Sequence, residues 1–365
     1  MQSQVYPWMQ DQWQQLVQQY QANRLPHALL FSGPEGVGKY NFARLLVETL
    51  LCDENNPRNH NPANEWKISP PCGKCNGCQL LAAGTHPDSY TIRPETEGKQ
   101  IQIASIREIN QFVSLTSQFA PLQAVIISPA EAMNRSSANA LLKTLEEPRP
   151  GKLIILISSQ PSRLLPTIKS RCQQISFALP ANDLAMTWLA ERDGSGADRS
   201  MHQRLLTLAG GAPLLAMQYM NQGKLELYQQ LLQSFEKLGK KQVDPVAEAK
   251  RWEAAGLAHC VKWLYLWVSS LIHLKSITGV VDTTVVDATL VDKTSDEKIL
   301  VDKKIVENNT LWREPVLDFL IDKTSSASLY AYLDQLIETA RVVNTPVNVQ
   351  LTLENLLMAW SQRLK

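Results

Sequence analysis

A glycine-rich loop limits the folds open to this chain more than any other feature. Gly33, Gly36, Gly38 and Lys39 fit the pattern of a phosphate-binding loop, which carries glycines and ends in Gly-Lys. The apolar run at 28–31 predicts a buried strand before the loop, and apolar residues recur at helical spacing after it. Glycines let backbone N–H groups face a phosphate, and the lysine could reach its outer oxygens. This strand–loop–helix order predicts a nucleotide-binding type of α/β domain.

Part of the chemistry that such a loop normally supports is missing. Tyr40 stands where a Ser or Thr hydroxyl would hold Mg²⁺. A second buried strand, expected at 124–128, ends in Ser128 and Pro129, where P-loop ATPases carry carboxylates that bind the metal and polarise water. Glu131 is expected to be a first-turn residue of the next helix. We therefore expect no intrinsic ATP hydrolysis; weak, metal-poor nucleotide binding and a vestigial loop both stay open.

Four of the six cysteines are spaced as metal ligands. Cys72, Cys75 and Cys78 are separated by two-residue spacers, and Cys52, after the preceding helix, can complete a tetrahedron. Sulfur ligands in this geometry suit a closed, structural Zn²⁺ site. An iron–sulfur cluster and free thiols are the alternatives. The long spacer after Cys52 contains His60, which is an alternative fourth ligand.

The remaining composition favours a cytoplasmic protein. Cys172 and Cys260 lie in apolar sequence and are expected to be buried thiols. No secretory signal is recognisable, so a disulfide framework is not expected. The net charge of +1 argues against a globally basic nucleic-acid binder. The most apolar stretch, 257–274, is interrupted by His, Lys and Ser residues and does not read as a membrane span.

Apolar patterning divides the chain into three regions. Residues 1–179 alternate strand candidates with amphipathic helices, which predicts the α/β class with a parallel, helix-covered sheet and a zinc module at 52–78. Residues 180–220 read as a small helical lid, and 221–365 as an entirely helical domain. The strand candidates are 28–32, 89–93, 124–128, 153–158 and 174–178.

Two features of the last region need separate interpretation. Residues 279–308 repeat a Val-Asp pair, which fits neither a helix face nor a strand face, so we predict a low-complexity insertion that forms a loop. Trp252, Trp263 and Trp267 lie in helical patterns. We expect these tryptophans to pack between helices rather than to stack on nucleic-acid bases.

Several segments resemble the AAA+ clamp-loader family of bacterial DNA polymerase III. Residues 138–148, Ala-Asn-Ala-Leu-Leu-Lys-Thr-Leu-Glu-Glu-Pro, look like a helix of those ATPases, and the triplet 170–172, Ser-Arg-Cys, resembles their arginine-finger motif. Residues 84–88 and the opening Tyr-Pro-Trp at 6–8 add to the match. The resemblance covers residues 1 to about 215 and implies a RecA-like AAA+ domain, a helical lid and an all-α C-terminal collar.

The resemblance also implies roles for single residues. Ser128 and Pro129 fall where active relatives carry Asp and Glu, and Leu214 falls where they carry a nucleotide-sensing Arg. Arg171 is similar to the family's arginine finger, which reaches the ATP site of the neighbouring subunit. A surface arginine at a helix end is the alternative. The family carries a cysteine cluster at the same position, which favours zinc over the other possibilities.

The implied function is that of a non-hydrolysing clamp-loader subunit, with ATP binding by this chain doubtful. The C-terminal domain would join a collar with the gamma/tau motor subunits and the delta subunit, and the complex would load the sliding clamp on primer–template DNA in the cytoplasm. Two alternatives belong to other classes: an active motor ATPase that tolerates Tyr40, Ser128 and Pro129, and a zinc-dependent nucleic-acid-binding module.

Overall fold

The computed structural model describes residues 4–56, 68–94, 98–194, 196, 198–277, 315–343 and 347–363. These residues belong to two compact units. The first comprises Met1–Trp188 with Ala212–Leu215, and the second comprises Leu189–Gly211 with Ala216–Lys365. The Val-Asp repeat of 279–308 and His60 lie outside the described residues.

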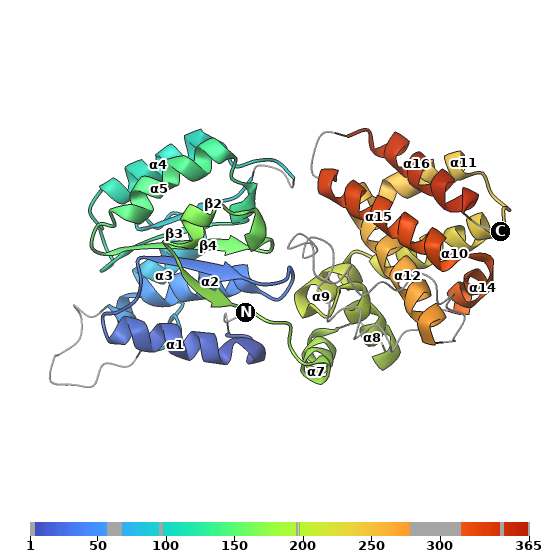
Figure 1. The fold of residues 1–365 in the computed structure, drawn as a ribbon. Helices are drawn as coiled ribbons and strands as arrows, with labels where there is room; N and C mark the ends of the chain where they lie inside the picture. The colour runs from blue at the N-terminus through green and yellow to red at the C-terminus, as the bar shows by residue number, and fades with distance from the viewer. Residues whose placement is uncertain are drawn as a thin grey trace. The chain divides into compact units, whose positions relative to one another are not determined.

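The first unit is built on a five-stranded parallel sheet (Figure 1). Its strands lie in the order β2-β3-β4-β1-β5, so the loop strand β1 is next to β4. All five residues of β1 and of β3 are buried, which explains why both read as continuous apolar runs. The predicted parallel α/β class is confirmed, and each strand lies within two residues of its expected bounds. The strands are β1 (Ala28–Ser32), β2 (Ser89–Ile92), β3 (Gln123–Ile127), β4 (Lys152–Ser158) and β5 (Gln173–Ser176).

Helices cover both faces of this sheet (Figure 1). Figure 1 shows α4 and α5 on one side, and α1, α2 and α3 on the other. Successive side chains of β1 point to opposite faces of the sheet, as the two-residue period of a strand requires. Leu30 joins the cluster under α4 and α5, whereas the ring of Phe31 packs edge-on against Phe42 of α2. The helices of the first unit are α1 (Gln10–Gln21), α2 (Lys39–Leu50), α3 (Asn76–Ala83), α4 (Ile103–Ser114), α5 (Arg135–Glu146) and α6 (Pro166–Lys169). The next helix, α7 (Asn182–Arg192), begins in the first unit and ends in the second.

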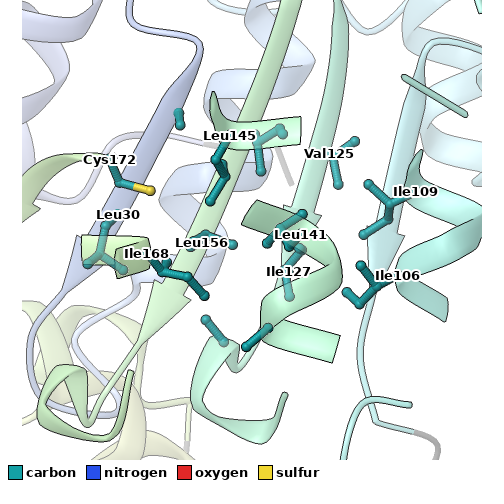
Figure 2. Packing of buried hydrophobic residues seen from close by; sticks show 14 of the residues in the cluster. Leu30, Ile106, Ile109, Val125, Ile127, Leu141, Leu145, Leu156, Ile168 and Cys172 are labelled. Carbon is teal, nitrogen blue, oxygen red and sulfur yellow. The ribbon is translucent and has the colours of Figure 1, made fainter. Parts of the chain in front are cut away.

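The core between the sheet, α4, α5 and α6 is apolar and closely packed (Figure 2). Leu141 and Leu145 of α5 face Val125 and Leu156 of the central strands, and all four are buried. Cys172, which the sequence predicts to be a buried thiol, belongs to the same cluster. This packing fixes the ends of α5 and α6 relative to the sheet.

The second unit is helical throughout its described part. Its tryptophans confirm the expectation of core packing, because Trp252, Trp263 and Trp267 are all buried, as is Cys260. Trp360 stacks on a phenylalanine of α10 within the same core. The helices are α8 (Arg199–Leu208), α9 (Pro213–Asn221), α10 (Lys224–Gly239), α11 (Pro245–Trp252), α12 (Leu257–Ile277), α14 (Pro315–Lys323), α15 (Ser326–Val342) and α16 (Val349–Gln362), with the first residues of α9 in the first unit.

No single helix of the described residues has the length and apolar character to cross a bilayer. The pair Pro245–Ala255 and Leu257–Ser276 passes on length and composition only when joined, and it is bent by 113° at the break.

Candidate functional site

Three glycines of the loop between β1 and α2 have positive φ angles, and two of them, Gly36 and Gly38, lie against side chains of other segments. Gly36 and Gly38 have φ angles of 75° and 106°, which side chains other than glycine rarely adopt. A Cβ on Gly38 would lie 2.6 Å from the ring of Tyr6, and one on Gly36 would lie 2.4 Å from Leu215. Neighbouring side chains therefore pack directly on the loop backbone.

Lys39 is bound by the loop itself. Its Nζ donates to the carbonyl oxygens of Gly33 at 2.7 Å and Pro34 at 2.6 Å, and it lies 3.2 Å from the hydroxyl of Ser159 at the end of β4. Only 5% of the residue is exposed. Burial lowers the pKa of Lys39 to about 8, although the nearby carboxylates, chiefly Glu131, oppose this effect. In this structure Lys39 therefore holds the loop closed through hydrogen bonds to the loop's own backbone.

Tyr40 does not leave its position open for a metal ligand. The guanidinium carbon of Arg93, which follows β2, lies 3.4 Å from the centroid of the Tyr40 ring. This is a close cation–π contact at the first turn of α2. A phenol held flat under a guanidinium cannot act as the short hydroxyl ligand that Mg²⁺ requires.

Glu131, which follows β3, links the ends of two neighbouring strands through hydrogen bonds. Glu131 lies in the first turn of the short 3-10 helix Ala130–Ala132, as predicted. Its Oε1 accepts the backbone N–H groups of Ser159 and Gln160, at 3.0 and 3.2 Å. These bonds join the end of β3 to the end of β4. The sequence did not reveal this contact, because the partners are about thirty positions away and contribute only backbone atoms.

Leu214 lies beside the glycine-rich loop and contacts it through its backbone, whereas a nucleotide-sensing arginine would act through its side chain. Its backbone N–H donates to the carbonyl of Gly36 at 3.0 Å. The opening aromatic residues, read from sequence only as a family signature, add to this packing. Trp8 donates from Nε1 to the carbonyl of Val37 at 2.9 Å, and its ring stacks on Tyr6 at 5.1 Å. The first unit thus covers the loop with its own backbone and aromatic groups.

The four predicted cysteine ligands come together. Their sulfur atoms all lie within 4.8 Å of one another, with Cys52 and Cys75 3.8 Å apart and Cys72 and Cys78 4.0 Å apart. A tetrahedral metal with bonds of about 2.3 Å would place its sulfur ligands about 3.8 Å apart, so these residues fit such an ion. Backbone N–H groups also donate to two of the sulfurs. The cluster could hold a metal.

The surrounding segments fix the cysteine cluster to the sheet domain. Cys75 caps the N-terminus of α3 by accepting the N–H of Cys78. Asp53 accepts the N–H of Gly77 at 3.3 Å, where a Cβ would come within 2.6 Å of the Leu51 carbonyl oxygen. These contacts hold α3 against the chain that leaves α2.

Arg171 lies on the corner between α6 and β5. Its Nη2 is 2.7 Å from Oε1 of Glu146, and its Nη1 donates to the carbonyl of Thr167 at 2.9 Å. The side chain is 34% exposed. The two sequence motifs that carried the family resemblance therefore meet in space, since Glu146 lies in one and Arg171 is the centre of the other.

The sheet order, the glycine-rich loop after β1 and the helical second unit define the class of this protein. It has the AAA+ fold followed by a helical C-terminal region.

Comparison with known sequences identifies the family. A family model described as "DNA polymerase III, delta subunit" matches residues 8–181. The DNA polymerase III subunit delta' of Pseudomonas aeruginosa is 35% identical over 359 residues, which cover 98% of this chain and 97% of that protein. The delta' subunit of Escherichia coli K12 is 35% identical over 212 residues, or 58% of this chain and 60% of the relative. The chain therefore belongs to the delta' family of DNA polymerase III subunits.

A solved structure of a gamma subunit-related protein of DNA polymerase III from Thermotoga maritima is also similar to this chain. It covers 95% of the chain at 20% identity, with a TM-score of 0.38. The family assignment rests on the sequence relatives.

Proposed function

We propose that this chain is a non-hydrolysing subunit of a DNA polymerase III clamp loader. In this proposal it lends Arg171 to the ATP site of a neighbouring gamma/tau motor subunit. It also joins the delta subunit in a complex that loads the sliding clamp on primed DNA in the cytoplasm. Membership in the delta' family supports the assignment of this chain to a DNA polymerase III clamp-loader complex. The specific role rests on the residues of the first unit.

One observation carries the non-hydrolysing part of this proposal: the amine of Lys39 is used to close its own loop. A phosphate would have to compete with two short charge-assisted hydrogen bonds for that amine. Neither Tyr40 nor the Ser128–Pro129 pair supplies a carboxylate that could hold Mg²⁺ in compensation. ATP binding by this chain is therefore not part of the proposed mechanism.

In this proposal Arg171 contributes a positive charge to the ATP site of the neighbouring subunit. A guanidinium presented to a neighbour can neutralise the charge that develops on a transferred phosphoryl group, an effect of roughly 10³-fold or more in rate. Its outward position supports this role, because a third of the side chain is exposed. Its two anchoring contacts, to Glu146 and the Thr167 carbonyl, come from its own subunit.

We also propose that the cysteine cluster holds a structural zinc ion through Cys52, Cys72, Cys75 and Cys78. Four thiolates close the coordination shell of Zn²⁺, so the ion would stabilise the fold and would not bind substrate. The cluster would then join the chain after α2 to α3. DNA contact through this module is not required.

Substitution of Arg171 in the assembled complex tests the central proposal. Arg171→Ala is expected to leave assembly with motor and delta subunits intact and to lower DNA-stimulated ATP turnover tenfold or more, as roughly expected for loss of a charge-stabilising arginine. The measurement is steady-state phosphate release at saturating ATP and primed DNA. Arg163→Ala is the matched control, because Arg163 lies on the nearby turn Pro161–Arg163 and bonds only locally to Gln160.

Two results would contradict the proposal. Turnover that is unchanged by Arg171→Ala would remove the role in trans. Steady phosphate release by the isolated chain with Mg²⁺-ATP would instead identify an active motor subunit.

A further inference from the structure

The guanidinium of Arg171 is held on two sides by its own chain. Nη2 pairs with Glu146 at 2.7 Å, and Nη1 bonds to the Thr167 carbonyl at 2.9 Å and lies 3.4 Å from the hydroxyl of Ser170. The last two partners are local, within four residues of Arg171. Glu146 is the distant one, since it lies twenty-five positions earlier on another helix.

The backbones of this pair are fixed by the core and not by the ion pair. Leu145 precedes Glu146 and Cys172 follows Arg171; both are buried in the cluster that Figure 2 draws, together with Ile168 of α6. Close packing sets the relative position of the α5 end and the α6 corner. The contact between Glu146 and Arg171 therefore acts on the side chains, whose ends are partly exposed.

Glu146 stands at a position that disfavours a lone carboxylate. It is the last residue of α5, where the helix dipole places partial negative charge. The guanidinium of Arg171 supplies the compensating positive charge. The adjacent Glu147 is exposed and forms no ion pair among the described residues, so it offers an internal comparison.

We propose that Glu146 is a positioning residue for Arg171. This inference rests on the proposed role of Arg171 in trans. The carboxylate keeps the long arginine side chain in one arrangement before the neighbour's nucleotide arrives, so less conformational freedom is lost when the two subunits engage. A guanidinium has five N–H donors, and the contacts with Glu146, Thr167 and Ser170 leave donors for phosphoryl oxygens.

The test compares complexes that differ only in this subunit: Glu146→Ala, Glu147→Ala, Arg171→Ala and the double variant Glu146→Ala/Arg171→Ala. Glu146→Ala is expected to lower the DNA-stimulated kcat for ATP by roughly three- to tenfold, as loss of part of the ordering of one arginine predicts. Glu147→Ala should match the wild type. The double variant should be no slower than Arg171→Ala alone, because no guanidinium is left to position.

A charge-exchanged variant distinguishes positioning of the Arg171 side chain from simple stabilisation of the fold by the ion pair. Glu146→Arg/Arg171→Glu restores an ion pair between the same two positions but removes the guanidinium from the corner. A purely structural pair predicts recovered turnover; positioning predicts turnover as low as that of Arg171→Ala. Recovered turnover would overturn the inference.

The remaining outcomes distinguish this inference from the proposed function. If Arg171→Ala slows turnover but Glu146→Ala behaves like Glu147→Ala, the positioning role is wrong and the role of Arg171 stands. If the losses of the two single variants multiply in the double variant, Glu146 acts independently of Arg171, and the inference fails. If Arg171→Ala has no effect, both the proposed function and the inference fail.

Discussion

Lys39 shows that the lysine of a phosphate-binding type of loop can bond to the loop itself. Its amine, which the motif would direct to a phosphate, closes the loop through the carbonyls of Gly33 and Pro34. The residue is almost fully buried, so these bonds are shielded from water. Lys39 therefore contributes to the stability of the folded loop.

Replacement of Lys39 is therefore expected to affect stability without any nucleotide present. Lys39→Met keeps the length of the side chain but leaves two carbonyl oxygens without this donor, which should cost about 1–3 kcal/mol in the free energy of unfolding. Urea denaturation of the isolated chain measures this cost. Lys143→Met, at an exposed position of α5, is the control and should change it little. An unaltered midpoint for Lys39→Met would show that the loop does not depend on its lysine.

His86 links stability to pH at the residue scale. It is buried, and its Nδ1 accepts the N–H of Asp88 at 3.0 Å. Burial lowers the pKa of His86 below its ordinary 6.5, although the carboxylates of Asp88 and Asp53 oppose the shift. The unfolded chain therefore binds the proton first on acidification. The stability that neutral His86 contributes is fully present above pH 6.5 and is lost as the pH falls toward its folded-state pKa.

The corresponding prediction concerns the slope of stability against pH. His86→Asn keeps an acceptor for the Asp88 N–H but does not titrate. Between about pH 7 and 5, the free energy of unfolding of the variant, measured by urea denaturation, should fall less steeply than that of the wild type, by up to about 1.4 kcal/mol per pH unit. Asp88 titrates below this window. Burial alone would raise its pKa, but hydrogen bonds, including three from the backbone N–H groups of 118–120, hold it below its ordinary value. Parallel curves for the two proteins would contradict the assignment to His86.

At the scale of elements, the cysteine cluster makes two segments depend on each other. The turn after α2 supplies Cys52, and the start of α3 supplies Cys75 and Cys78. Neither segment alone presents four ligands, so a bound ion would order both.

Loss of one ligand should therefore remove the metal and loosen this region together. Purified wild-type chain is expected to carry about one zinc ion, and Cys75→Ser should carry little metal and melt at a lower temperature. Metal analysis and thermal unfolding provide the measurements. Cys260→Ser is the control, because that thiol is buried in the second unit and should leave the metal content unchanged. Normal folding with lost DNA affinity in Cys75→Ser would favour the nucleic-acid-binding alternative.

The strands and most helices follow from local sequence, whereas the contacts at the loop do not. β1 and β3 are buried on both faces, so each is a short continuous apolar run that can be recognised from sequence. The roles of Tyr6 and Trp8 depend on packing against residues about thirty positions later. No periodicity records such a contact, because it is made by tertiary structure alone.

At the scale of the whole molecule, more of the first unit than of the second can be predicted from the sequence. The first carries motifs with chemical meaning, and the structure brings the cysteine ligands together as their spacing predicts. The pairing of Arg171 with Glu146 was not predicted, although both lie in motifs that the sequence analysis selected. For the second unit the sequence gives helices and a tryptophan-rich core, but no residue pattern that specifies a binding partner.

The glycines at 36 and 38 have a consequence for how such sequences are interpreted. Tyr6 and Leu215 occupy the space that a Cβ would need, and the positive φ angles also disfavour other residues, so the folded loop requires glycine at both positions. Packing within the fold thus accounts for these two glycines without reference to a bound phosphate. A survey that counts ATP-consuming proteins by this signature would therefore include any chain in which packing alone requires the glycines.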